Sequence, residues 1–94
     1  MVRNLTSKRT GRNVANQFVI TLNGCSYFQS YKTLIAKVDE SGKITLSSYW
    51  NYSNTTRKYL YQFLAEHGYC GMNGDKVQAL INSNEIGYTS RIAM

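Results

Sequence analysis

Aromatic and basic residues are mixed along two stretches of the chain, and this mixture is the pattern in the sequence that could support a binding chemistry. Tyrosine and tryptophan rings can stack on nucleobases, while lysine and arginine side chains can bind phosphates. The same residue types can equally form the core and rim of a small fold. The two stretches contain Tyr27, Phe28, Tyr31 and Lys32, and then Tyr49, Trp50, Tyr52, Arg57, Lys58 and Tyr61.

Five of these residues are the candidates for a binding surface in the body of the protein. Helical spacing sets Arg57, Lys58 and Tyr61 away from the apolar stripe of a predicted helix. Tyr31 lies at a predicted bend and Tyr52 lies just before the start of that helix. Because one helix covers only one face of a small sheet, tyrosines elsewhere must contact water or a partner.

The first 16 residues carry positive charge without an acidic residue. Their basic residues are Arg3, Lys8, Arg9 and Arg12, whereas the rest of the chain holds seven basic and five acidic residues. The segment has no apolar periodicity, so we predict a flexible basic arm over residues 1–16 and a single domain over residues 17–94. The four side chains of the arm either bind phosphate backbones or only solvate a tail.

The sequence contains no pattern typical of an enzyme or a metal site. His67, Cys25 and Cys70 are the only soft metal ligands, and a structural zinc ion normally takes four. The acidic residues are scattered, and no glycine-rich phosphate loop or nucleophile motif is present. We therefore expect a protein without catalytic activity, cofactor or bound metal.

The apolar runs are too short to span a membrane, and the N-terminus has no apolar signal core. We therefore expect a cytoplasmic protein with no membrane partner. The two cysteines, which are 45 positions apart in the sequence, are expected to be free thiols.

Alternating apolar residues predict a first strand from Gln17 that reaches a turn at Asn23-Gly24. Asn-Gly is a strong signal for a two-residue hairpin turn, because both positions need a positive φ. This turn sets Val19 opposite Phe28 on one face of the sheet. The opposite face then carries three pairs: Leu22 with Cys25, Ile20 with Tyr27, and Phe18 with Gln29.

The second predicted strand is long, and its apolar face changes from odd-numbered to even-numbered positions. A β-bulge or bend within residues 29–33 explains this change, because one extra residue exchanges the two faces. A three-residue turn at residues 40–42, with Gly42 left-handed, then sets Val38 opposite Ile44 and Ala36 opposite Leu46. The same turn places Asp39 beside Lys43 as a weak surface pair.

An amphipathic helix is predicted from near Thr55 to Gly68, capped by Ser53 and Asn54. Its apolar stripe covers one face of the sheet, and Trp50 is expected to wedge the corner between sheet and helix. A short second helix is predicted from Asn73 or Gly74 to Asn82, and the end of the chain can return as an edge strand. The stripe consists of Tyr59, Leu60, Phe63 and Leu64.

The predicted fold is therefore α+β. It consists of a three-stranded antiparallel meander packed by one main helix, with a short second helix and a C-terminal edge strand.

The segment FQSYKTLIAKVDESGKITL, followed by YWNYSNTTRKYLYQFL, resembles a family of small proteins carried by bacteriophages and mobile elements. The resemblance covers residues 28–64 and transfers no chemistry to any residue. It implies a phage accessory protein that acts in a bacterial host cell. Accessory phage proteins of this size often inhibit host defence, as anti-CRISPR proteins do, or are small nucleic-acid-associated regulators.

The main functional hypothesis is an anti-defence inhibitor that binds a host protein or nucleoprotein complex. A small basic regulator that binds DNA or RNA directly is the alternative, and a structural homo-oligomer is a third. All three agree with the basic, tyrosine-rich composition.

Overall fold

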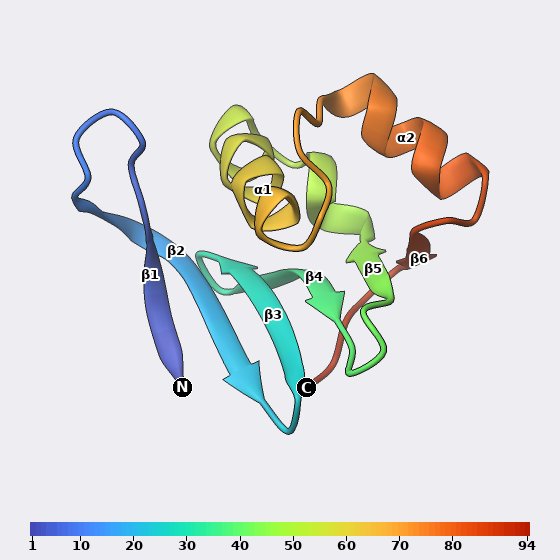
Figure 1. The fold of residues 1–94 in the computed structure, drawn as a ribbon, viewed down its shortest axis with the longest axis horizontal. Helices are drawn as coiled ribbons and strands as arrows, with labels where there is room; N and C mark the ends of the chain where they lie inside the picture. The colour runs from blue at the N-terminus through green and yellow to red at the C-terminus, as the bar shows by residue number, and fades with distance from the viewer.

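The computed structural model describes residues 1–94, which form one six-stranded sheet with both α-helices on one side of it (Figure 1). The strands lie in the sheet in the order in which they occur in the chain. The elements are β1 (Val2–Thr6), β2 (Asn13–Leu22), β3 (Cys25–Ser30), β4 (Thr33–Val38), β5 (Ile44–Ser47), the 3₁₀-helix η1 (Ser48–Asn51), α1 (Asn54–Glu66), α2 (Gly74–Asn82) and β6 (Gly87–Thr89).

The predicted α+β class and both predicted helices are confirmed, but the sheet is larger than a three-stranded meander. Neighbouring strands from β1 to β5 pair antiparallel, and β6 pairs parallel with β5 after the chain crosses over through α1 and α2. The C-terminal strand is thus present at the edge of the sheet, as expected.

Strand β1 contradicts the prediction of a flexible arm over residues 1–16. Val2 pairs with Ile20 and Asn4 pairs with Phe18, so this segment forms one edge of the sheet. Leu5 is only 1% exposed and belongs to the hydrophobic core. The prediction failed because backbone pairing and a single buried side chain hold the strand, and neither produces periodicity in the sequence.

Two of the predicted turns are confirmed in detail. Asn23 and Gly24 have φ values of 53° and 80°, and Val19 pairs with Phe28 across the resulting hairpin. Gly42 has a φ of 88°, and Val38 pairs with Ile44.

The loop between β4 and β5 is held by hydrogen bonds to Asp39 and not by an ion pair. The Asp39 carboxylate accepts hydrogen bonds from the backbone amides of Ser41 and Lys43. The Lys43 ammonium instead donates to the carbonyl oxygens of Asn84 and Glu85, which fastens this loop to the chain before β6.

The predicted long second strand is wrong, because the chain reverses direction at Tyr31-Lys32 and forms the separate strands β3 and β4. Ser30 pairs with Thr33 across this two-residue turn. The pairing register also shifts between Phe28 and Gln29, which leaves Ile35 as an extra residue of β4, just beyond the window where a bulge was expected. The reversal was missed because neither turn residue is glycine, asparagine or aspartate.

The helix α1 packs on the face of the sheet that carries Val19 and Phe28. The rings of Phe28 and Phe63 stack with their centroids 5.9 Å apart. Tyr59, Leu60, Phe63 and Leu64 are all buried, so the predicted apolar stripe is confirmed. Phe18, Ile20 and Leu22 lie on the opposite face.

The ends of α1 follow the predicted local signals. The Ser53 side chain accepts a hydrogen bond from the Thr56 amide at 3.1 Å, which satisfies one amide of the first turn. At the other end, His67 caps the helix and Gly68 has a φ of 94°. Trp50 in η1 is 5% exposed and lies in the core, as the corner position required.

No helix of the protein is long and apolar enough to cross a membrane.

Replacing Leu5 with alanine should lower the free energy of unfolding by about 2–5 kcal/mol, because it leaves a cavity beneath β1. The matched control is Val2→Ala in the same strand, since Val2 is 62% exposed. That variant should stay within about 0.5 kcal/mol of the unchanged protein in urea denaturation. A neutral effect of Leu5→Ala would mean that the segment is the mobile arm after all.

Replacing Trp50 with alanine should cost about 3–5 kcal/mol of stability, because its buried ring joins η1 to the core. Tyr52→Ala, two residues later, removes a ring that is 78% exposed and should be close to neutral. Equal midpoints of thermal unfolding for the two variants would exclude a structural role for Trp50.

Candidate functional site

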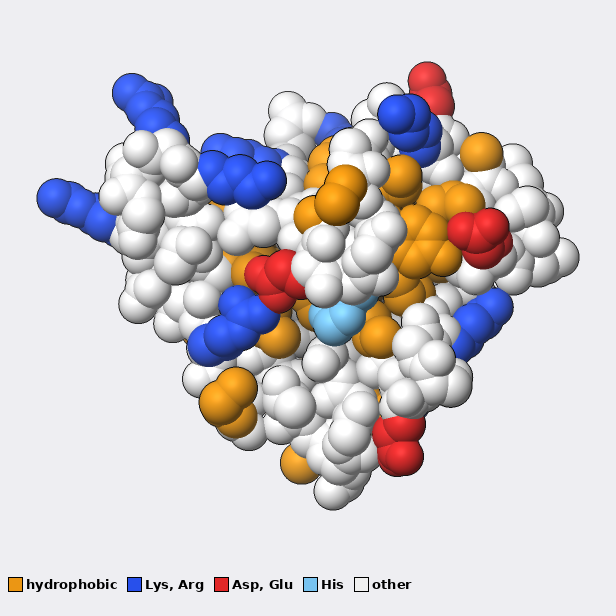
Figure 2. Space-filling model, viewed as in Figure 1, with side chains coloured by type: hydrophobic (Ala, Val, Ile, Leu, Met, Phe, Trp, Pro, Cys, Tyr) orange, Lys and Arg blue, Asp and Glu red, His pale blue; other side chains and the backbone are white.

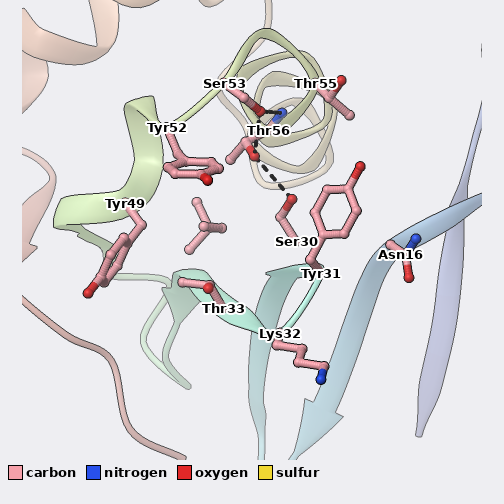
Figure 3. A pocket seen from close by; sticks show the side chains of 11 residues that line it. Asn16, Ser30, Tyr31, Lys32, Thr33, Tyr49, Tyr52, Ser53, Thr55 and Thr56 are labelled. Atoms are coloured by element: carbon pink, nitrogen blue, oxygen red, sulfur yellow. Dashed lines mark hydrogen bonds between the residues drawn. The ribbon is translucent and has the colours of Figure 1, made fainter.

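An open cleft of about 770 Å³ lies between the β3–β4 turn and the junction of η1 with α1 (Figure 3). Three tyrosines line it, and we call it the tyrosine cleft: Tyr31, Tyr49 and Tyr52, which are 54%, 46% and 78% exposed. Figure 3 shows the rings of Tyr31 and Tyr52 projecting into the same space from opposite sides. Such exposed rings leave their flat faces available to a ligand.

Tyr31 is held at the cleft by a backbone conformation that is unusual for its residue type. Its φ is 57°, in the left-handed region that favours glycine. Two hydrogen bonds fix the residue: its amide donates to the Asn16 carbonyl oxygen, and its own carbonyl oxygen accepts from the Gln29 side chain, both at 2.7 Å. The turn thus places a large aromatic ring where a glycine would relieve the backbone.

Hydroxyl groups form the wall of the cleft beneath the two rings. The oxygens of Ser30 and Thr56 lie 3.1 Å apart, and the Ser53 hydroxyl donates to Thr56, also at 3.1 Å. These hydroxyls bond to one another and join β3 to α1. The buried side chain of Ile35, 1% exposed, adds an apolar surface to the lining.

Gln17 lies next to this hydroxyl network, because it pairs with Ser30 across β2 and β3. Its side chain is fully buried, and neither its amide nitrogen nor its amide oxygen has a hydrogen-bond partner. A buried amide without partners lowers stability.

A second depression of about 430 Å³ lies between the β1–β2 loop and α1, and we call it the basic groove. Lys8 and Arg9 of the loop face Lys58 and Tyr61 of the helix across it. The Gln62 side chain donates to the Thr6 carbonyl oxygen at 3.0 Å, which holds the end of β1, where the loop begins, against α1. Figure 2 shows lysine and arginine side chains gathered at this corner of the molecule.

Burial raises the pKa of the Tyr61 phenol above its ordinary value of 10.0, and Arg57 acts in the opposite direction. Tyr61 therefore remains a neutral hydrogen-bonding group in the groove at physiological pH.

The tyrosine cleft and the basic groove adjoin along α1. Thr55 lines the cleft and Lys58 lines the groove, and residues three apart on a helix are neighbours on its surface. Their separation along the helix axis is about 4.5 Å. The two depressions are therefore adjacent on α1, and no acidic residue lines either of them.

The fold brings most of the predicted binding residues to this surface. Two of them, Tyr31 and Tyr52, line the tyrosine cleft, and four others line the groove. Those are Lys8, Arg9, Lys58 and Tyr61.

Three predicted binding residues lie outside both depressions. Arg57 donates to the side chains of Asn51 and Asn54, so it joins η1 to α1. Arg3 forms an ion pair with Glu66 and fastens β1 to the end of α1. Arg12 lies exposed at the end of the β1–β2 loop.

The site also contains residues that the binding prediction did not include. Asn16, like Tyr31, has a positive φ, of 64°, and lines the cleft. Ser30 and Thr56 are 26 positions apart in the sequence, and no local pattern indicates that they meet. Ser53 could have indicated part of this wall. A capping side chain bonds to the residue three positions later, which here is Thr56.

The chain's only histidine lies outside the cleft and the groove. Its ring packs against Phe63 with centroids 4.7 Å apart. Cys25 and Cys70 are free thiols, and no three His, Cys, Asp or Glu side chains are grouped so that they could hold a metal ion.

Acidification should destabilise the protein through His67. Burial lowers the pKa of its ring below the ordinary 6.5, with Glu66 opposing the shift and Arg3 adding to it. Between the folded-state pKa and 6.5 the unfolded chain binds the proton more readily, so the free energy of unfolding decreases as the pH falls through this window.

The measurement is urea denaturation at about pH 7.5 and about pH 5.5, on the unchanged protein and on His67→Gln. The variant should lose less stability between the two pH values than the unchanged protein does. The same loss in both proteins would assign the pH dependence to other groups.

The model of a family of unknown function (DUF8033) matches residues 2–81, which include every residue that lines the cleft and the groove but not β6. No curated protein and no solved structure matches the chain.

Proposed function

The chain belongs to the DUF8033 family, whose description assigns no activity, and from the geometry of its surface we propose that it is a non-enzymatic accessory protein. In this proposal it is encoded by a phage or mobile element, and it binds and inhibits a nucleic-acid-handling or defence complex of the bacterial host. The tyrosine cleft and the basic groove make the contact.

The observation that supports this proposal is the adjacency of the two depressions along α1. Exposed aromatic rings at one end adjoin basic side chains at the other, without an acidic residue in the lining. Aromatic and arginine side chains carry much of the binding energy in protein interfaces, and positive charge steers association with nucleoprotein.

The chemistry of the cleft favours binding over catalysis. The hydroxyls of Ser30, Ser53 and Thr56 are bonded to one another, and none of them forms a hydrogen bond to a histidine, lysine or carboxylate side chain. A nucleophile needs such a base or a lowered pKa to react.

Direct binding of DNA or RNA, as in a small regulatory protein, is the second candidate. It is favoured by the same adjacency of tyrosine rings and basic side chains, because single-stranded nucleic acids bind to surfaces of this composition.

A structural homo-oligomer is the third candidate, and the outer face of the sheet favours it. Both helices lie on the other side of the sheet, and Val2 and Leu22 are 62% and 44% exposed. Sizing chromatography tests this candidate, since an assembly through that face would elute ahead of a monomer of 10.7 kDa.

The inhibitor proposal predicts that removing charge from the basic groove weakens capture of the host complex. The test variant is Lys8→Gln with Lys58→Gln, and the matched control is Lys37→Gln with Arg91→Gln. Lys37 lies over the Tyr27 ring on the outer face of the sheet, and Arg91 follows β6, so neither lines the groove.

Both variants lose two charges, and both should retain the melting temperature of the unchanged protein. Each tagged protein is incubated with lysate of the source cell without nuclease treatment, so that the nucleic acid of any complex stays intact, and co-purified proteins are quantified by mass spectrometry. A component of a nucleic-acid-handling complex should fall about tenfold with the groove variant, equivalent to about 1.4 kcal/mol, and should be unchanged with the control. Equal recovery with both variants would refute the proposed contact.

A further inference from the structure

We propose that the tyrosine cleft binds a nucleobase of a single-stranded nucleic acid and that the basic groove binds the phosphates of the same strand. This inference rests on the proposed function, and it names the component of the host complex that the surface recognises. The cleft and the groove have separate tasks: the first takes an unpaired base and the second neutralises the adjoining backbone.

The lining of the cleft matches the chemistry of a base. A nucleobase has flat apolar faces and a polar edge, so it needs aromatic walls and hydrogen-bonding groups in one plane. Tyr31 and Tyr52 present rings from opposite sides of the space (Figure 3), and the polar residues Asn16, Thr33 and Thr55 also line it. The volume of about 770 Å³ lies within the range of small-molecule pockets, so the cleft has room for a base and its sugar.

The conformation of Tyr31 is a separate argument for a role of its ring. A left-handed φ costs a residue with a bulky side chain stability that glycine would not lose. The ring is 54% exposed, so packing in the protein does not compensate for that cost. A ligand that stacks on the exposed ring would compensate for that cost.

The groove supplies the charge that a polyanion requires. Lys8, Arg9 and Lys58 are exposed, none of them forms an ion pair, and Gln62 holds the end of β1, where the loop that carries the first two begins, against α1. Because Thr55 and Lys58 are neighbours on α1, the phosphates next to a base in the cleft are within reach of the groove.

A single strand fits this surface better than a duplex. The faces of paired bases are stacked on one another in a double helix, so they are closed to the tyrosines. Duplex DNA could use only the phosphate contacts in the groove, which by themselves support weak, salt-sensitive binding.

The experiment measures fluorescence anisotropy of labelled 12-mers with the full chain at low salt. The four probes are oligothymidylate, oligouridylate, an abasic oligonucleotide with the same number of phosphates, and a matched DNA duplex. At least one of the two base-bearing single strands should bind about tenfold or more tightly than the abasic strand and the duplex, and the comparison between those two identifies DNA or RNA as the source.

Three substitutions assign the binding to the cleft. Tyr52→Ala and Tyr31→Gly should each weaken single-strand binding by about 5- to 150-fold, the loss typical of one stacked base. Tyr31→Gly should also melt at the same temperature as the unchanged protein or higher, because glycine relieves the left-handed turn. The control Tyr88→Ala removes a ring in β6 that is equally exposed, at 54%, and should leave the affinity unchanged.

Equal affinity for the abasic and base-bearing strands would overturn the inference, as would an equal loss in Tyr88→Ala or the absence of any binding at low salt. If the single strands do not bind but the groove variant still loses the host complex, the base site is refuted and the proposed function stands. If the single strands bind as expected but no host complex depends on the groove, the base site stands and the inhibitor function is refuted.

Discussion

The packing of α1 against the sheet is the contact on which the rest of the structure depends. Phe28 and Phe63 stack at its centre, and Leu60 and Leu64 beside them are fully buried. A side chain of this kind contributes about 1.5–3 kcal/mol when it is buried, so a few such residues fix the position of the helix. Because α1 forms one wall of both the tyrosine cleft and the basic groove, the same packing determines the width of both.

Polar contacts at the two ends of α1 refine that position. Ser30 and Thr56 connect the start of the helix to β3, and the ion pair of Arg3 with Glu66 connects its end to β1. These contacts are weaker than the apolar packing, but they are directional. They hold the wall of the cleft and the edge strand in one register with the helix.

Much of the fold could be predicted from the sequence, because turn chemistry and helix caps are local. The turns at Asn23-Gly24 and Gly42 fixed two strand registers, and Ser53 and Gly68 marked the ends of α1. What could not be predicted depends on tertiary structure. Tyr31 adopts a left-handed conformation that tyrosine does not favour, so its residue type does not indicate a turn. The sequence therefore predicts one bent strand where the protein has two.

The candidate site was predictable to the same extent. Helical spacing alone directs Lys58 away from the core, and it sets Tyr61 at the boundary, where its half-buried ring packs against the core. They approach Lys8 and Arg9 only because β1 and β2 form a hairpin. The polar, basic sequence of that segment does not indicate a hairpin. Arg57 was assigned to binding from its exposure on the helix, whereas it forms contacts within the protein, because short-range partners in η1 cannot be recognised by helical spacing.

The topology of the sheet has a consequence for the order in which the chain assembles. From β1 to β5 every strand pairs with its neighbour in the sequence, so these contacts close short loops and can form while the chain is being synthesised. The strand β6 pairs parallel with β5 only after α1 and α2 have crossed over, which closes a loop of about 40 residues. It is therefore the last of the six strands that can pair, and until it does, the edge of β5 offers unpaired backbone groups to other chains.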